Sequence, residues 1–148
     1  MQCVILAAGE GSRMRPLTSS RPKVMLPLVG KPMLEHLIRN VRDAGIKEII
    51  IVVGYKEEAI REYFGDGRSF GVSITYVVQR KQLGTADALR TAEPFITDTF
   101  LMLNGDMVVE IGDLQKICRT EAPVMAVTTP KSCGWVVVVP AITGASVR

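Results

Sequence analysis

Apolar runs typical of buried strands alternate with helix-patterned segments along the chain. Residues 2–7 (QCVILA) and 48–53 (EIIIVV) are runs of the kind found in strands that are buried on both faces of a parallel sheet. Between them, leucine, isoleucine and valine recur at helical spacing over residues 34–41, and Gly45 follows where a helix C-cap belongs. The pattern predicts a strand, a helix and a second strand in succession.

The same criteria extend this alternation along the rest of the chain. They predict a helix over 56–64, a turn over 65–67, a strand over 73–78, a helix over 85–92, a strand over 99–103, a helix over 111–119, and strands near 124–128 and 135–139. Strands that alternate with helices predict βαβ units around a mostly parallel sheet. We therefore expect one α/β domain over residues 1–148, with a Rossmann-like, three-layer, mostly parallel sheet flanked by helices.

The last predicted strand, residues 135–139 (WVVVV), has the apolar sequence of a core strand, yet only the residues 140–148 follow it. Two interpretations are open: an edge strand with a frayed tail, or a chain that stops before its fold is complete. An uncovered strand over 136–139 would favour self-association into a homo-oligomer.

Composition and charge narrow the class of protein. Of the 148 residues, 47% are hydrophobic and 22% are charged, as in soluble globular domains, and the net charge of +3 does not imply a nucleic-acid partner. No apolar run approaches the roughly 18–20 residues that cross a bilayer, and no basic leader precedes the first strand, so we expect no membrane association and a cytoplasmic protein. Cys3, Cys118 and Cys133 form no CxxC pair and no metal-ligand spacing, which predicts reduced thiols, with Cys3 buried.

A glycine-rich loop follows the first strand. It reads LAAGEGSRMRP over residues 6–16, and RPK follows at residues 21–23. Small residues let the backbone approach a ligand closely and present N–H groups to oxyanions, whereas Arg13 and Lys23 add the positive charge that a polyphosphate requires. The loop therefore indicates a phosphate-binding site.

Three other interpretations of this loop explain less. A P-loop is excluded, because Ser12 and Arg13 follow Gly11 where that motif has Lys and Ser or Thr. A dinucleotide-binding fingerprint is weak, because Met14 stands where a third glycine is needed. A plain strand-to-helix turn explains the glycines but leaves Arg13 and Lys23 without a role.

The segment from Leu6 to Ile38, LAAGEGSRMRPLTSSRPKVMLPLVGKPMLEHLI, resembles the signature of the sugar-nucleotide pyrophosphorylases, which include glucose-1-phosphate thymidylyltransferases and the uridylyltransferase half of bifunctional archaeal enzymes. The resemblance implies a nucleotide-diphospho-sugar transferase fold, incomplete here at its C-terminus, that joins a nucleoside triphosphate to a sugar-1-phosphate and releases pyrophosphate. It also implies that the backbone of Leu6, Ala7, Ala8, Gly9 and Gly11 holds the nucleotide, that Arg13 neutralises the β- and γ-phosphates, and that Lys23 holds phosphate oxygens at the reacting centre.

The segment QRKQLGTADAL over residues 79–89 has a second part of the expected site. A glutamine amide offers both a donor and an acceptor to a base. In the family this pattern contacts a pyrimidine, which carries over to Gln79, Gly84 and Thr85 and favours UTP or dTTP over GTP. The alternative is a helix start with Thr85 as N-cap and Gly84 as its flexible entry, which gives Gln79 no role. Both interpretations can hold together.

The triplet Asn104-Gly105-Asp106 follows the strand predicted over 99–103. Ligands collect beyond the carboxyl ends of parallel strands, although Asn-Gly is also a strong hairpin pattern. The resemblance favours the first interpretation and implies that Asp106 binds Mg²⁺. The expected catalytic residues are then Arg13, Lys23 and Asp106, which act by positioning and charge neutralisation without a general base.

Three other polar residues are expected to be structural. His36 has no nearby Cys, Asp or second His that would indicate a metal site or a triad. Asp66 fits a turn, and Asp87 fits the first turn of a helix.

The sugar side departs from the family pattern. The segment PKSCGWV over residues 130–136 resembles the family's P-x-x-Y-G-V-V, with Cys133 and Trp135 as substitutions and Gly134 as the expected sugar contact. No candidate for a second acidic metal ligand follows Glu121. The chain is therefore an enzyme domain for glucose-1-phosphate or N-acetylglucosamine-1-phosphate, or a non-catalytic nucleotide-binding or regulatory module of the same fold, or an inactive fragment.

Overall fold

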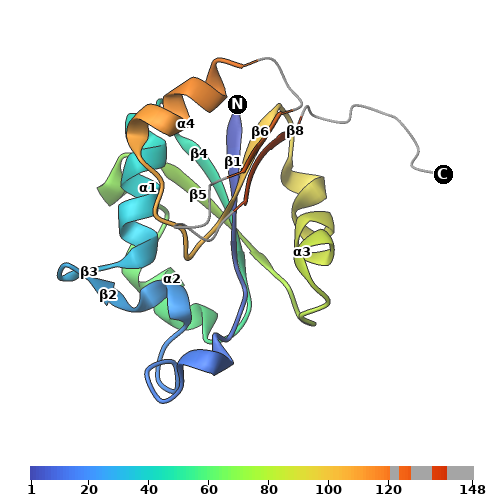
Figure 1. Ribbon diagram of the computed structural model, residues 1–148. Helices are drawn as coiled ribbons and strands as arrows, with labels where there is room; N and C mark the ends of the chain where they lie inside the picture. Colours follow the sequence, from blue (N-terminus) through green and yellow to red (C-terminus); the bar gives the residue numbers. More distant parts are fainter. Residues whose placement is uncertain (121–123, 128–134, 140–148) are drawn as a thin grey trace.

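The computed structural model describes residues 1–120, 124–127 and 135–139, and its main feature is a six-stranded sheet (Figure 1). The strands of this sheet are β1 (Gln2–Ala7), β4 (Glu48–Val53), β5 (Ser73–Val78), β6 (Phe100–Asn104), β7 (Val124–Val127) and β8 (Trp135–Val139). The α-helices in these ranges are α1 (Met33–Asp43), α2 (Glu57–Phe64), α3 (Thr85–Ala92) and α4 (Ile111–Cys118). The short elements are the 3-10 helices η1 (Ser12–Met14), η2 (Lys23–Met25), η3 (Arg68–Phe70) and η4 (Glu93–Phe95), and the strands β2 (Pro27–Leu28) and β3 (Lys31–Pro32).

The strand order in the sheet is β5-β4-β1-β6-β8-β7. β4, β5 and β6 join β1 in a parallel arrangement, whereas β8 runs antiparallel to β6 and β7 runs antiparallel to β8. The mostly parallel α/β sheet expected from the sequence is therefore confirmed. None of the helices in the described ranges is long and apolar enough to span a membrane.

Both faces of β1 and β4, in the middle of the sheet, are buried, which explains the nearly continuous apolar runs of these two strands. On one face, Ile5 and Ile51 pack in a cluster with α1, α2 and α4, where Leu37 is buried. On the other face, Val4 packs in a second cluster with Ala88 of α3. Figure 1 shows α1, α2 and α4 on one side of the sheet and α3 on the other, which confirms the three layers.

Most predicted elements are present with small shifts in their bounds. β1, β4, β5 and α3 have the predicted bounds. β6 begins and ends one residue later than predicted, α2 begins at Glu57 rather than Lys56, and α4 ends at Cys118 rather than Arg119. Gly45 adopts a φ of 101° directly after the Ala44 C-cap of α1, as its place in the sequence indicated.

β8 is an interior strand, so the prediction that residues 135–139 form an edge strand is wrong. Val138 lies opposite Leu101 of β6 on one side, and Val137 lies opposite Met125 of β7 on the other. Because β7 is added beyond β8, both edges of β8 are already paired. The expected homo-oligomer, which rested on an uncovered strand over 136–139, stays a prediction.

Two local alternatives are also wrong. Asn104 and Gly105 do not form a hairpin turn, because the chain continues into α4 and β6 pairs with β1 and β8. Thr85 is not an N-cap, because the cap position of α3 is Gly84, with a φ of 101° and no side-chain capping hydrogen bond.

The two short strands β2 and β3, which were not predicted, form an antiparallel hairpin before α1. His36 of α1 hydrogen-bonds through Nε2 to the carbonyl oxygen of Leu28 at 2.7 Å, which is a structural role as expected. Asp66 also has its expected place in a turn, where its Oδ1 accepts a hydrogen bond from the N–H of Arg68 at 3.0 Å.

The two cysteines in the described ranges are free thiols. Cys3 is fully buried in β1, and Cys118 is half-buried near the end of α4. Burial raises the pKa of both thiols, so both stay protonated near neutral pH. The expectation of reduced thiols is confirmed for these two, whereas Cys133 lies outside the described residues.

Candidate nucleotide-binding site

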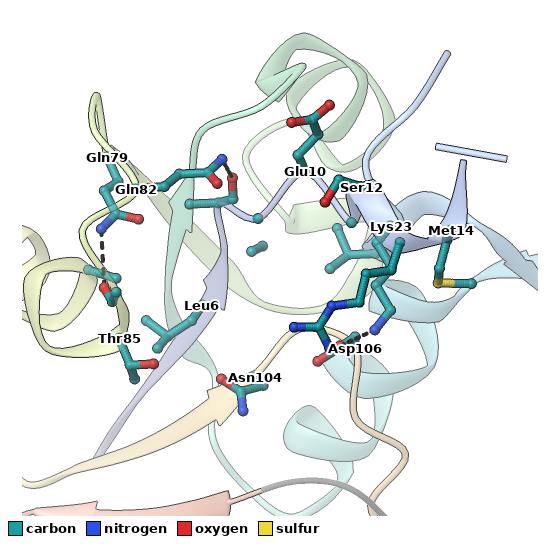
Figure 2. A pocket seen from close by; sticks show the side chains of 18 residues that line it. Leu6, Glu10, Ser12, Met14, Lys23, Gln79, Gln82, Thr85, Asn104 and Asp106 are labelled. Atoms are coloured by element: carbon teal, nitrogen blue, oxygen red, sulfur yellow. Dashed lines mark hydrogen bonds and ion pairs between the residues drawn. The ribbon is translucent and has the colours of Figure 1, made fainter. Parts of the chain in front are cut away.

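A cavity of about 550 Å³ opens where β1, β5 and β6 end, the position at which open parallel sheets bind ligands (Figure 2). The loop after β1, η1, part of η2 and the loop between β5 and α3 line it. The lining residues are Leu6, Ala7, Ala8, Gly9, Glu10, Gly11, Ser12, Arg13, Met14, Lys23, Val24, Gln79, Gln82, Gly84, Thr85, Ala88, Asn104 and Asp106.

The loop after β1 presents unpaired backbone N–H groups. Within the described part of the chain, no hydrogen bond engages the N–H groups of residues 9–13, all of which line the cavity. Gly11 has a φ of 69°, and a Cβ at this position would lie 2.8 Å from the Cβ of Lys23. Only glycine fits this backbone without displacing Lys23. Successive free N–H groups in such a loop can bind oxyanions.

Two further glycines let neighbouring loops pack closely against the first one. A Cβ on Gly54 would lie 2.9 Å from the carbonyl oxygen of Ala8, and a Cβ on Gly105 would lie 2.9 Å from Cγ1 of Val24. The N–H of Gly105 donates to the carbonyl oxygen of Leu6 at 2.8 Å. The end of β6 is therefore held directly against the end of β1.

The cavity contains one paired cation and one available cation. Nζ of Lys23 donates to Oδ2 of Asp106 at 2.5 Å, and about a third of each side chain is exposed (Figure 2). Arg13 is exposed and has no ion-pair partner among the described residues, and Glu10, which also lines the cavity, pairs with Arg15. Two cations beside free N–H groups suit a polyanionic ligand.

Asp106 can hold a magnesium ion together with ligands from a substrate. Within the described ranges, no cluster of three or more His, Cys, Asp or Glu is arranged to bind a metal. Mg²⁺ commonly takes one or two carboxylates and completes its coordination with water and substrate phosphates. A carboxylate next to free backbone N–H groups and two cations has the chemistry to hold a magnesium ion that accompanies a nucleotide.

The loop between β5 and α3 is fixed by two glutamine side chains. Gln79 is only 6% exposed, and its Nε2 donates to Oδ2 of Asp87 at 2.8 Å and to the carbonyl oxygen of Gly84 at 3.3 Å. Gln82 reaches the first loop, where its Nε2 donates to the carbonyl oxygen of Ala8 at 2.8 Å. We expected that Gln79 would have no role if this segment were only the start of a helix. That expectation is wrong, because Gln79 hydrogen-bonds to Asp87 in the first turn of α3.

The residues expected in the site come together, with one exception. Those that line the cavity are Leu6, Ala7, Ala8, Gly9, Gly11, Arg13, Lys23, Gln79, Gly84, Thr85 and Asp106. Gly134, the expected sugar contact, lies outside the described residues.

Four lining residues whose side chains can form hydrogen bonds or carry charge were missed, namely Glu10, Ser12, Gln82 and Asn104. Gln82 lies three residues after Gln79 in the same loop, so the sequence does contain a second carboxamide that could have been predicted as part of the site. Asn104 precedes Asp106 by two residues and lines the same cavity. Nothing in the sequence indicated Glu10 except its place in the loop.

Comparison with known proteins assigns the family. The model of the family described as nucleotidyl transferase matches residues 2–132, which is most of the chain. The chain belongs to the nucleotidyl transferase family. The matched range includes every residue expected in the site except Gly134.

Curated relatives of this chain are considerably longer. The chain is 47% identical over 110 residues to the bifunctional protein GlmU of Methanococcus maripaludis (strain C5), an alignment that covers 74% of the chain and 26% of GlmU. It is 44% identical over 123 residues to the UTP–glucose-1-phosphate uridylyltransferase AglF of Haloferax volcanii, which covers 82% of the chain and 50% of AglF. The chain thus spans between a quarter and a half of the length of these relatives.

Solved structures share the fold of this chain. A Bacillus anthracis protein assigned as a glucose-1-phosphate thymidylyltransferase, solved with sucrose, superposes with a TM-score of 0.79 at 26% identity, covering 95% of the chain and 72% of that protein. A UDP-glucose pyrophosphorylase in complex with UDP-glucose has a TM-score of 0.68 at 26% identity, covering 78% of the chain and 51% of that protein.

Proposed function

We propose that this chain is the nucleotide-binding part of an enzyme that transfers the nucleotidyl group of UTP or dTTP to a sugar-1-phosphate. The observation that supports this most directly is the cavity at the end of β1, which combines free backbone N–H groups with Arg13, Lys23 and Asp106. The names of two similar proteins, the uridylyltransferase AglF and the UDP-glucose pyrophosphorylase, describe reactions of the same class as the one proposed here. We take glucose-1-phosphate or N-acetylglucosamine-1-phosphate as the acceptor.

The proposed reaction needs little beyond positioning and charge. A phosphate oxygen of the sugar-1-phosphate attacks the α-phosphorus, the bond from that phosphorus to the oxygen of the β-phosphate breaks, and pyrophosphate leaves with the bonding electrons. The attacking oxygen is already ionised, so no general base is required. Arg13 and Lys23 stabilise charge on the phosphate oxygens, and Asp106 would hold a magnesium ion, which would supply further neutralising charge.

Removal of any one charged group in the cavity should slow the reaction strongly. We expect Arg13→Ala, Lys23→Ala and Asp106→Ala each to lower the rate of pyrophosphate release by about 10²–10³, because each removes a group that stabilises charge in the transition state. The assay uses UTP, dTTP, GTP and ATP with Mg²⁺ and each of the two sugar phosphates. Arg68→Ala is the control, since Arg68 is 90% exposed and pairs with Asp66 away from the cavity.

Nucleotide binding separates the proposed activity from its alternatives. Calorimetric binding of UTP or dTTP with no pyrophosphate release under any condition would favour a non-catalytic module or an inactive fragment. No binding of any nucleoside triphosphate would contradict the proposed function. A variant of Arg13, Lys23 or Asp106 that folds and turns over at the full rate would exclude that residue from the mechanism.

A further inference from the structure

We propose that Asp87 selects the base of the nucleotide by fixing the orientation of the Gln79 amide. Asp87 itself does not line the cavity, so it is a positioning residue that acts through Gln79. The inference rests on the proposed function, because it requires the base of a nucleoside triphosphate to lie against Gln79.

The orientation of the Gln79 amide follows from the chemistry of its partners. The amide faces a carboxylate oxygen of Asp87 at 2.8 Å and the carbonyl oxygen of Gly84 at 3.3 Å. Both partners accept hydrogen bonds and neither can donate one. The nitrogen of the amide must therefore face them, and both of its N–H donors are used within the protein.

The oxygen of the Gln79 amide is left to face a ligand. No hydrogen bond from the described part of the chain reaches Oε1, and no buried side-chain nitrogen or oxygen in that part lacks a partner. Oε1 is therefore accessible from the cavity that Gln79 lines. Figure 2 shows the amide nitrogen of Gln79 turned toward its neighbouring loop and the oxygen turned the other way.

An acceptor fixed at this position discriminates between bases. Uracil and thymine carry an N–H donor at N3, which Oε1 of Gln79 can accept. Cytosine presents a bare ring nitrogen at the same position, so two acceptors would face each other and one hydrogen bond would be lost. Interactions of this kind between a carboxamide and a base edge are the usual basis of base discrimination by proteins. With Asp87 in place, the pocket accepts UTP and rejects CTP.

The substitution Asp87→Asn should relax this discrimination. An asparagine amide can accept or donate, so it tolerates both orientations of the Gln79 amide, and the longer hydrogen bond to Gly84 at 3.3 Å would by itself favour the original orientation only weakly. We expect the unsubstituted chain to bind UTP about 10- to 100-fold more tightly than CTP. In Asp87→Asn the ratio should fall to about threefold or less, mainly because CTP binds more tightly. Calorimetric titration of the folded chain with each nucleotide and Mg²⁺ measures both constants.

A matched control separates base selection from helix stability. Asp113→Asn removes the first-turn carboxylate of α4, as Asp87→Asn does for α3, but Asp113 pairs with the exposed Lys116 and has no contact with Gln79. It should leave the UTP to CTP ratio unchanged. The inference is overturned if Asp87→Asn keeps the original UTP to CTP ratio, whether or not the binding of both nucleotides becomes equally weaker. If the unsubstituted chain binds neither UTP, dTTP nor CTP, the proposed function fails and the inference fails with it.

Discussion

Gly9 and Gly11 lie two residues apart in the same loop, but only one of the two positions has no space for a side chain. A Cβ on Gly9 would meet nothing within 4 Å, and the backbone there has no positive φ. A Cβ on Gly11 would meet Lys23 at 2.8 Å on a backbone whose φ is 69°. Gly11 is therefore required by the fold, whereas Gly9 leaves room for a ligand at the cavity wall.

Alanine substitutions should separate these two roles. We expect Gly9→Ala to change the free energy of unfolding by less than about 1 kcal/mol, because its backbone suits any residue, yet to weaken UTP binding about tenfold, or about 1.4 kcal/mol. Gly11→Ala should lower the free energy of unfolding by about 1–2 kcal/mol. Urea unfolding and calorimetric UTP binding measure the two effects. Equal loss of stability in both variants would contradict this division.

At the scale of elements, the β2–β3 hairpin has an unfavourable turn. Val29 and Gly30 form its two-residue loop with φ values of 50° and 78°, the geometry in which Asn-Gly is preferred. A β-branched residue is disfavoured in this left-handed region, and the Val29 side chain, 90% exposed, gains little from packing in return. The hairpin therefore stores backbone strain at its tip.

Val29→Asn should relieve that strain. We expect a gain of about 1 kcal/mol in the free energy of unfolding, which corresponds to a rise of roughly 2–4 °C in the melting temperature of a chain of this size. Val108→Asn is the control, because Val108 is also exposed, at 68%, but has no positive φ. A similar gain from both substitutions would mean that removal of an exposed apolar side chain, rather than backbone geometry, is responsible.

At the scale of the whole molecule, the buried carboxylate of Glu35 joins three elements. Oε1 accepts from Nε of Arg39 in the same helix at 2.7 Å and lies 3.6 Å from Nζ of Lys31 in β3, while Oε2 accepts from the Tyr63 hydroxyl of α2 at 2.5 Å. Burial alone would raise the pKa of Glu35, but these hydrogen bonds and positive charges outweigh it and lower the pKa below its ordinary value of 4.5.

This network should make stability depend on acid pH. Because the pKa of Glu35 is lowered in the folded state, its contribution is complete above pH 4.5 and is lost as the pH falls through the folded-state pKa. We expect Glu35→Gln to cost about 1.5–3 kcal/mol at pH 7 and progressively less as the pH falls below 4.5. Glu57→Gln, at a surface pair with Arg61, should cost less than about 1 kcal/mol. Unfolding curves for Glu35→Gln and the unsubstituted chain that stay equally separated at every pH would contradict this expectation.

How far the sequence predicts this molecule depends on whether a feature is local. β1 and β4 could be bounded because burial on both faces makes their sequences almost continuously apolar, and the loop after β1 was recognisable by its glycines and cations. The place of β8 in the sheet could not be predicted, because strand pairing is a contact between distant segments. The β2–β3 hairpin, with two residues in each strand, is too short for any period to appear. The pairing of Gln79 with Asp87 depends on how a loop folds back on a helix, which residue types alone do not reveal.

The ion pair between Lys23 and Asp106 affects how strongly the cavity attracts an anionic ligand. In the ligand-free protein these two groups are each other's counterion, so their fields largely cancel beyond a few ångströms. An arriving anion is attracted first by Arg13, the cation of the described cavity without a partner. We therefore expect the ammonium group of Lys23 to become fully available only when Asp106 binds another positive charge, so that Lys23 engages an anion later than Arg13 does.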